Sequence, residues 1–352
     1  MKLLWRNLMK KHINIPIFIP HLGCPNNCVF CNQRSISGRM SFDPADAERQ
    51  IDEVLATLPE DTEREIAFFG GSFTGIDREL MLYLLGIAKR YVDEGKAGGI
   101  RLSTRPDYID EERLDILAEY GVTAVELGLQ SMDAEVLAAS KRGHTVLDAE
   151  RACSLIKQYG FELIGQMMIG LPASTPEKET LTAEKICAMG ADGARVYPTV
   201  VFYETELCQM AERGEYTPLA EEDAVERTKN VLAVFDAHGV PCIRVGLCAS
   251  ENLSDEGEVY GGANQSAIGE LAMGELYLER ICDILDKRPD IRGNCLTIYA
   301  PVGAVSKVAG QNKRNKIKIC KKYGFNKIKI LEKREIIGYN IILDCKDISA
   351  EK

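Results

Sequence analysis

Six short apolar runs, each typical of a β-strand, alternate with longer stretches whose apolar residues recur at helical spacing. The runs are IPIFIP (15–20), REIAFFGG (64–71), GIRLST (99–104), VTAVELGLQ (122–130), FELIGQMMIG (161–170) and GARVYPTVV (193–201). Nearly continuous apolar runs fit a parallel sheet covered by helices. We therefore predict an α/β fold of six βα units, as an open sheet or an incomplete barrel. Either form binds ligands at the carboxyl ends of its strands.

The composition is that of a globular protein without a membrane segment. A chain of 352 residues that is 45% hydrophobic can form one large domain and a small appendage. Lys2, Arg6, Lys10 and Lys11 interrupt the first apolar residues before they reach signal-peptide length. No later run approaches the roughly 18 apolar residues of a membrane helix. We expect a cytoplasmic protein with no membrane partner.

Charge is distributed unevenly along the chain. Residues 293–352 contain 13 Lys and Arg against 5 Asp and Glu, although the whole chain has a net charge of −10. The part before them is therefore strongly acidic. This asymmetry predicts two units with different partners, a core at 1–288 and a small basic module at 289–352.

Three cysteines, Cys24, Cys28 and Cys31, follow the first predicted strand with CxxxCxxC spacing. A structural zinc site normally has four ligands, and only His21 lies close enough in sequence to supply a fourth. A [4Fe–4S] cluster is usually held by four thiolates, so three would leave one iron free. A free iron beside an α/β crevice suits a small molecule that must bind the metal and accept an electron, as S-adenosylmethionine (SAM) does.

The ends of the other predicted strands carry polar and glycine-rich motifs. These are GGSFT (70–74), STRPD (103–107), ELGLQS (126–131), GQMMIGLP (165–172) and ARVYP (194–198). Together with the cysteine spacing, they resemble the radical SAM superfamily. The resemblance implies a partial (β/α)6 barrel in which the three cysteines hold a [4Fe–4S] cluster. SAM binds the fourth iron and is reductively cleaved to methionine and a 5′-deoxyadenosyl radical.

The resemblance also implies site residues on the same rim. Paired glycines allow close backbone approach to a ligand. The residues implied to bind SAM are Gly70, Gly71, Ser72, Thr74, Ser103, Arg105, Glu126, Gln130, Gln166 and Arg195. Candidates for relaying a hydrogen atom are Tyr197 and Cys248, with Tyr203 and Cys208 as further possibilities, and Lys141 and His144 of SKRGHT are candidates for substrate contact.

Longer motifs indicate a subgroup. STRPDYI, ELGLQSMDAEVL, KRGHT, MMIGLP and ARVYPTVV resemble the radical SAM domain of the catalytic subunit of Elongator and its short bacterial relatives, over about residues 15–275. That resemblance implies a tRNA substrate. However, Elongator's catalytic subunit spaces its first two cysteines more widely, and about 60 residues after the barrel are too few for its acetyltransferase domain. We therefore do not predict the use of acetyl-CoA.

The C-terminal residues read as a strand, an interrupted helix and two strands, which is a small α+β module. Its GQNK (310–313) resembles a degenerate KH loop with Lys313 at the second glycine position. Between residues 307 and 334 there are 11 basic residues and one acid, Glu332. A cluster of positive charges with so few acids favours binding to a polyphosphate chain. The predicted RNA-binding residues are Lys307, Lys313, Arg314, Lys316, Lys318, Lys321 and Lys322.

The sequence thus predicts a radical SAM enzyme that modifies a tRNA base and is reduced by a protein such as flavodoxin or ferredoxin. One alternative is a small-molecule enzyme similar to the oxygen-independent coproporphyrinogen oxidases, which would not need the basic module. Another is a non-catalytic iron–sulfur or RNA-binding protein that retains the fold.

Overall fold

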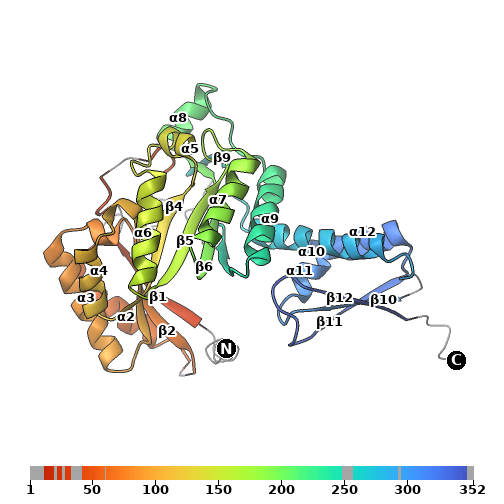
Figure 1. Ribbon diagram of the computed structural model, residues 1–352, viewed down its shortest axis with the longest axis horizontal. Helices are drawn as coiled ribbons and strands as arrows, with labels where there is room; N and C mark the ends of the chain where they lie inside the picture. Colours follow the sequence, from red (N-terminus) through yellow and green to blue (C-terminus); the bar gives the residue numbers. More distant parts are fainter. Residues whose placement is uncertain are drawn as a thin grey trace.

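A computed structural model describes residues 12–19, 22–25, 28–32, 42–59, 61–247, 257–291 and 295–346. Its main element is a parallel seven-stranded sheet in the order β1-β2-β3-β4-β5-β6-β8 (Figure 1). The strands are β1 (His12–Ile19), β2 (Glu63–Gly70), β3 (Gly99–Thr104), β4 (Val122–Gln130), β5 (Glu162–Ile169), β6 (Gly193–Pro198) and β8 (Cys242–Val245). The predicted α/β fold with six strands is confirmed, and β8 extends the sheet beyond β6.

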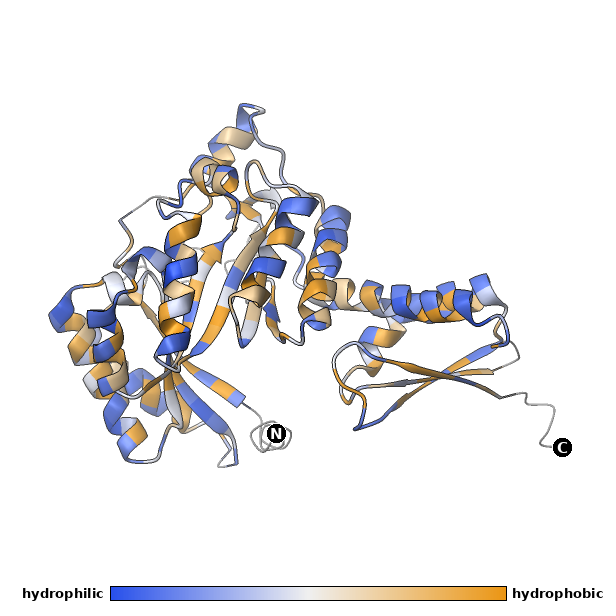
Figure 2. Cartoon of the chain, viewed as in Figure 1, coloured by the Kyte–Doolittle hydropathy of each residue, from blue (hydrophilic) through white to orange (hydrophobic). Residues whose placement is uncertain are grey.

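Helices connect the strands and cover one face of the sheet. They are α2 (Ala47–Leu55), α3 (Arg78–Asp93), α4 (Glu111–Glu119), α5 (Ala134–Ala139), α6 (Val146–Gln158), α7 (Pro176–Ala188), α8 (Glu206–Glu212) and α9 (Glu221–Ala237). Side-chain caps fix several helix starts, because Asp77, Asp110, Thr145 and Thr175 accept hydrogen bonds from first-turn amides. Both hydrophilic and hydrophobic residues occur along these helices in Figure 2, as expected of helices with one buried face.

Alternate residues of each strand point to opposite faces of the sheet. On β1, Ile15, Ile17 and Ile19 are buried in the core between sheet and helices. The residues that alternate with these isoleucines, such as Asn14 and Phe18, therefore face the opposite, concave side of the sheet. The same alternation places Arg101 of β3 and Glu126 of β4 on the concave side. This side, rather than the apolar core, carries the buried charges.

One predicted strand is corrected by the structure. The run 193–201 divides, because β6 ends at Pro198 and β7 (Val200–Phe202) pairs instead with β9 (Val259–Gly262) in an antiparallel ribbon. Proline has no amide hydrogen for a sheet. Thr199 then donates from its backbone amide to the carbonyl oxygen of Ile169 at 2.9 Å and turns the chain out of the sheet. The β7–β9 ribbon consequently lies near the carboxyl ends of the strands.

A smaller unit follows the barrel. It comprises α10 (Ile268–Lys287), β10 (Cys295–Ala300), α11 (Val305–Ala309), α12 (Arg314–Tyr323), β11 (Lys327–Glu332) and β12 (Ile342–Lys346). Its sheet has the order β11-β10-β12, with one parallel and one antiparallel pairing. The expected α+β module with strand, interrupted helix and two strands is therefore confirmed.

Helix α10 contributes to two cores. Leu278, Ile281 and Leu285 are buried in the core of the small sheet, whereas Ala272 and Leu276 pack in a cluster with Leu232 of α9. The division at 288/289 stays a prediction, because the helix before it packs on both sides. Among the described residues, no helix has the length and apolar character needed to span a membrane.

Candidate cofactor site at the carboxyl ends of the strands

The cysteine loop is fixed to the end of β2 by backbone contacts. Gly71 donates its amide hydrogen to Ile19 O at 2.8 Å, and Ser72 donates to Leu22 O at 2.9 Å. A Cβ atom on Gly71 would lie 1.8 Å from Leu22 O, and one on Gly23 would lie 2.1 Å from Ser72 O. Only glycine permits these approaches, so the glycines of this rim hold the loop against β2.

Two arginines lie beside the thiols. The Nη1 atom of Arg142 donates to the buried Sγ of Cys28 at 3.2 Å, and its Nη2 atom donates to Gly128 O of β4 at 2.6 Å. Burial raises the pKa of Cys24, and the charges of Arg105 and Arg142 act in the opposite direction. The side chain of Arg142 therefore joins the cysteine loop to the fourth strand.

The chemistry of the donors fits an iron–sulfur cluster, since thiolates are its usual ligands. Cys24, Cys28 and Cys31 lie on one loop, and none of them forms a disulfide bond. Within the described ranges, the His, Cys, Asp and Glu side chains form no group of three that could hold a metal ion. The alternative fourth ligand His21 and the relay candidate Cys248 lie outside the described residues.

At the ends of β2 and β3, predicted SAM contacts bond to one another. The hydroxyl of Thr104, which sequence reasoning missed, lies 2.8 Å from Ser72 Oγ and 2.6 Å from Thr74 Oγ1. Arg105 forms an ion pair with Asp107 at 2.9 Å and donates to Arg142 O. These side chains thus shape the rim beside the cysteine loop.

Four predicted SAM contacts form one cluster on the concave side of the sheet. Gln166 donates from Nε2 to Ser103 Oγ at 2.9 Å and to Glu126 Oε2 at 2.8 Å. Arg195 donates from Nη2 to Glu126 Oε1 at 2.8 Å, and its guanidinium lies 5.4 Å from the ring centroid of Phe69. Glu126 is 0% exposed. A buried carboxylate is thus held by a guanidinium and an amide.

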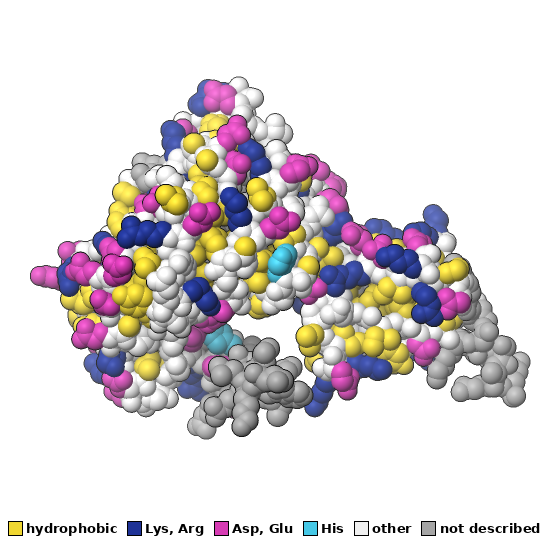
Figure 3. Space-filling view, in the orientation of Figure 1, with side chains coloured by type: hydrophobic (Ala, Val, Ile, Leu, Met, Phe, Trp, Pro, Cys, Tyr) yellow, Lys and Arg dark blue, Asp and Glu magenta, His cyan; other side chains and the backbone are white. Residues whose placement is uncertain are grey.

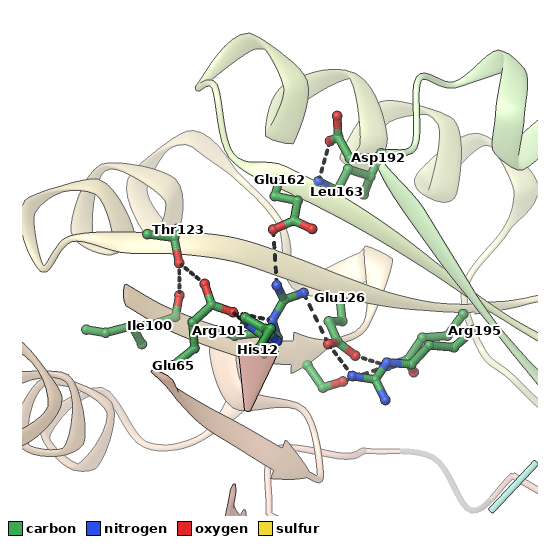
Figure 4. A network of polar contacts seen from close by, with 12 residues as sticks. His12, Glu65, Ile100, Arg101, Thr123, Glu126, Glu162, Leu163, Asp192 and Arg195 are labelled. Atoms are coloured by element: carbon green, nitrogen blue, oxygen red, sulfur yellow. Dashed lines mark hydrogen bonds and ion pairs between the residues drawn. The ribbon is translucent and has the colours of Figure 1, made fainter. Parts of the chain in front are cut away.

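The cluster extends deeper into the barrel through residues that the sequence analysis did not select (Figure 4). Arg101 donates to Glu65 at 2.8 Å and to Glu162 at 3.0 Å, and it lies 3.5 Å from Glu126. His12 contacts Glu65 at 2.9 Å. Burial alone would raise the pKa of Glu65, but the hydrogen bond from His12 and the charge of Arg101 lower it to about 2. The signal was present in the sequence as single charged residues within apolar strands, Glu65 in REIAFF and Arg101 in GIRLST.

Three of the predicted SAM contacts each have a buried polar side-chain atom with no hydrogen-bond partner among the described residues. These atoms are Arg105 Nη1, Gln130 Oε1 and Arg195 Nε. Gln130 also has a φ of 63°, which is uncommon for a residue with a side chain. Buried polar atoms are nearly always bonded, so these atoms fit contacts to a polar ligand such as SAM. Arg105, Gln130 and Arg195 are therefore the predicted SAM contacts that have an unused donor or acceptor among the described residues.

The other catalytic candidates have varied surroundings. Burial raises the pKa of Tyr197 and of Cys208. Burial also lowers the pKa of His144 to about 4, with the charge of Arg142 acting in the same direction, so the imidazole is neutral at physiological pH. Lys141 is exposed and forms an ion pair with Glu206 at 2.6 Å. Of these candidates, Tyr197 lies beside the Glu126 cluster, because the charges of Arg195 and Glu126 both act on its pKa.

The basic residues of the module divide into two groups. Arg314 and Lys318 bond to Glu275 of α10, at 2.5 and 3.2 Å, and Lys322 bonds to Asp286 at 3.1 Å. Lys307, Lys313, Lys316 and Lys321 have no ion pair with any described carboxylate. Figure 3 shows basic side chains on the module with acidic ones nearby.

The loop between α11 and α12 has an unusual backbone. Gly310, Asn312 and Lys313 all have positive φ, at 72°, 52° and 60°. A Cβ atom on Gly310 would lie 2.7 Å from Cγ of Asn315. The loop therefore requires glycine at 310, and it tolerates a side chain at 313, where the KH pattern has its second glycine.

Comparison with known proteins gives the family. The Radical SAM superfamily model matches residues 18–184, and the Radical_SAM C-terminal domain model matches residues 191–280. A tRNA uridine(34) acetyltransferase of Methanocaldococcus jannaschii is 30% identical over 247 residues, which are 58% of this chain and 45% of that protein. An uncharacterized protein of the same organism is 26% identical over 82% of this chain and 88% of its own length.

The structural comparison agrees at the level of the fold. An archaeal Elp3 of Methanocaldococcus infernus with an N-terminal deletion superposes with a TM-score of 0.59 and 22% identity, covering 80% of this chain and 64% of that one. The chain spans a little under half the length of the first acetyltransferases it matches. The two family matches run in succession over more than half of the chain, and the chain belongs to the radical SAM superfamily, whose cofactors are a [4Fe–4S] cluster and SAM.

Proposed function

We propose that this radical SAM enzyme modifies a base of tRNA. The observation that carries the proposal is the combination of two features: a cysteine loop near buried polar atoms that have no described partner, and module lysines that form no ion pair with a described carboxylate. Relatives named tRNA uridine(34) acetyltransferase and Elongator complex protein 3 support a tRNA substrate. A porphyrin substrate, the small-molecule alternative, gives no role to the lysines.

The residues of the rim have distinct proposed roles. Cys24, Cys28 and Cys31 hold the cluster, which with SAM supplies a one-electron reduction and a 5′-deoxyadenosyl radical when both are bound. Arg142 holds Cys28 and the fourth strand in register through its two hydrogen bonds. Gly71 and Ser72 hold the cysteine loop against the end of β2 through their backbone amides.

The concave cluster orients polar parts of the bound molecules. Arg195 has one donor bonded to Glu126 and a second, Nε, that is buried without a described partner. The Oε1 atom of Gln130 is an acceptor that is likewise buried without a described partner. Gln166, which also bonds to Ser103, donates to the carboxylate of Glu126, so that the guanidinium of Arg195 keeps one orientation. Preorganised groups of this kind bind a ligand without reorganising.

The module grips the RNA backbone in this proposal. Lys307, Lys313, Lys316 and Lys321 are the phosphate-contacting residues, because they lack described ion pairs. Arg314, Lys318 and Lys322 instead hold α12 on α10 through Glu275 and Asp286. This division narrows the seven predicted RNA contacts to four. A small electron-transfer protein such as flavodoxin or ferredoxin is the proposed reductant, and no residue is assigned to acetyl-CoA.

Nucleoside analysis of tRNA tests the proposal. Bulk tRNA from cells with and without the gene is digested and compared by liquid chromatography and mass spectrometry. We expect one modified nucleoside to disappear with the gene and to return with the wild-type gene, but not with a Cys28→Ser gene. Identical nucleoside profiles in all strains, together with a changed profile of small metabolites, would favour the small-molecule alternative.

A further inference from the structure

Two exposed tyrosines meet at the edge of the candidate site. Tyr203 directly follows β7 and is 42% exposed, and Tyr260 lies in β9 and is 37% exposed. Their ring centroids are 5.8 Å apart and their planes are at 86°. The amide of Tyr203 donates to Glu258 O at 3.0 Å, so the antiparallel ribbon holds both rings in place. An edge-to-face pair leaves an aromatic face open to solvent.

The pair is attached to the cysteine loop. Asn32, the residue after Cys31, donates from Nδ2 to Tyr203 O at 3.4 Å. Leu207 of α8 donates its amide hydrogen to Val29 O at 2.8 Å. Val29, Val201, Leu207 and Cys208 also share a small buried core, with Phe30 packed against it. The ribbon and the cysteine loop therefore form one packed unit.

We infer that Tyr203 and Tyr260 form a stacking platform for a nucleobase of the RNA substrate, at the entrance to the cysteine site. The inference rests on the proposed function and names the contact that receives the RNA base. Aromatic side chains bind unpaired bases by stacking, and every base presents a π-face. The exposure of the rings and their attachment to the cysteine loop place such a base beside the reaction centre.

A role in packing does not account for the pair. Phe202, the neighbour of Tyr203, is 2% exposed and belongs to the interior, whereas Tyr203 itself is 42% exposed. Relay of a hydrogen atom by Tyr203, one of the sequence-based possibilities, would require the phenolic hydroxyl. Stacking requires only the ring. A Tyr→Phe substitution therefore separates these two roles.

RNA binding by the full-length chain tests the inference. The probe is a fluorescein-labelled single-stranded RNA hexamer, with bulk tRNA as competitor, under anaerobic conditions at constant salt. Stacking is worth about 1 to 3 kcal/mol per base, so we expect Tyr203→Ala to weaken binding by roughly 5- to 150-fold. Tyr203→Phe keeps the ring and is expected to bind like the wild type. Tyr83→Ala, which removes a 49% exposed tyrosine of α3, is the matched control and is expected to have no effect.

A second readout detects the base itself. In a hexamer that contains 2-aminopurine, stacking on an aromatic ring quenches the fluorescence, and we expect the quenching by wild type to be lost in Tyr203→Ala and Tyr260→Ala. If wild type binds the hexamer and tRNA but neither alanine variant changes affinity or quenching, the platform is overturned while the proposed function stands. If wild type binds neither RNA at any salt concentration, both fail.

Discussion

The barrel and the C-terminal module place their charges in opposite ways. The barrel buries Glu126, Arg101 and Arg195 on the concave side of its sheet. The module buries apolar residues and the neutral amide of Asn315, and its many lysines lie at the surface. A buried ion pair seldom stabilises a fold more than apolar residues of similar size. The contrast supports the proposal that the barrel's charges serve a ligand and that the module's charges serve an external polyanion.

The largest expected effect comes from breaking the barrel's charge cluster. Glu126→Ala removes the carboxylate that pairs with Arg195 and leaves two guanidiniums less well compensated. We expect a loss of about 3 to 5 kcal/mol in the free energy of unfolding, measured by urea denaturation. Glu126→Gln retains the size of the side chain and is the control for cavity formation. A loss below about 1 kcal/mol in Glu126→Ala would show that the cluster is not a coupled charge network.

Acid should weaken the barrel through Glu65. Its pKa is about 2 in the folded chain against an ordinary value of 4.5, so it binds a proton more readily when unfolded. The stabilisation is therefore fully present above pH 4.5 and is lost as the pH falls through about 2, by about 3 kcal/mol in total. Urea midpoints between pH 6 and pH 2 measure it.

The matched variant for that experiment is Glu65→Gln, which cannot titrate. Its stability should fall less steeply over the same acid range, although its stability at pH 6 is lower because Arg101 and His12 lose a charged partner. If the stability of the wild type and that of Glu65→Gln fall in parallel with pH, the acid sensitivity belongs to other carboxylates.

The module's buried polar residue should matter less than the barrel's charges. Asn315 is 0% exposed and donates from Nδ2 to Gly274 O at 2.8 Å and to Val308 O at 3.3 Å, which ties α12 to α10 and α11. We expect Asn315→Ala to cost about 1 to 3 kcal/mol, because two buried carbonyl groups lose a donor. Thermal unfolding measures this cost, and a loss as large as that of Glu126→Ala would remove the contrast between the two regions.

The smallest effect separates two lysines of one helix. Lys316 has no described ion pair, whereas Lys318 bonds to Glu275. Lys316→Gln should lower the slope of log affinity for tRNA against log salt concentration by about one. Lys318→Gln should change this slope little, because its charge is already balanced. Fluorescence anisotropy, measured at about four salt concentrations between 50 and 200 mM, gives the slopes. Equal slopes for both variants would contradict the division of the basic residues into two groups.

Regular periodicity made much of the fold predictable. The strands and helices of the barrel follow from apolar runs and capping residues, and the module follows from a short strand pattern. The break at Thr199 was not predicted, because the apolar pattern continues from β6 into β7 and only tertiary contacts turn the chain. The apolar pattern of the sequence therefore does not show where the chain leaves the sheet.

The candidate site was predictable in part. Ser103, Glu126, Gln166 and Arg195 were selected from the strand motifs, and the structure brings the four together. However, Glu126, Gln166 and Arg195 lie within their strands on the concave face and not at the strand ends. Thr104 and Arg142 were missed because their partners lie far away in the sequence, in the segment after β2 and on the cysteine loop. The pairing of basic residues on α12 with acids on α10 was also hidden, since it depends on how two helices pack.

Formation of 5′-deoxyadenosine tests the central claim most directly. The protein is reconstituted anaerobically with iron and sulfide, reduced with dithionite and incubated with SAM, with and without tRNA. We predict 5′-deoxyadenosine in the wild type, more of it with tRNA, and none in variants with Cys24→Ser, Cys28→Ser or Cys31→Ser. A protein that carries zinc at these three cysteines and forms no 5′-deoxyadenosine under any of these conditions would contradict the account.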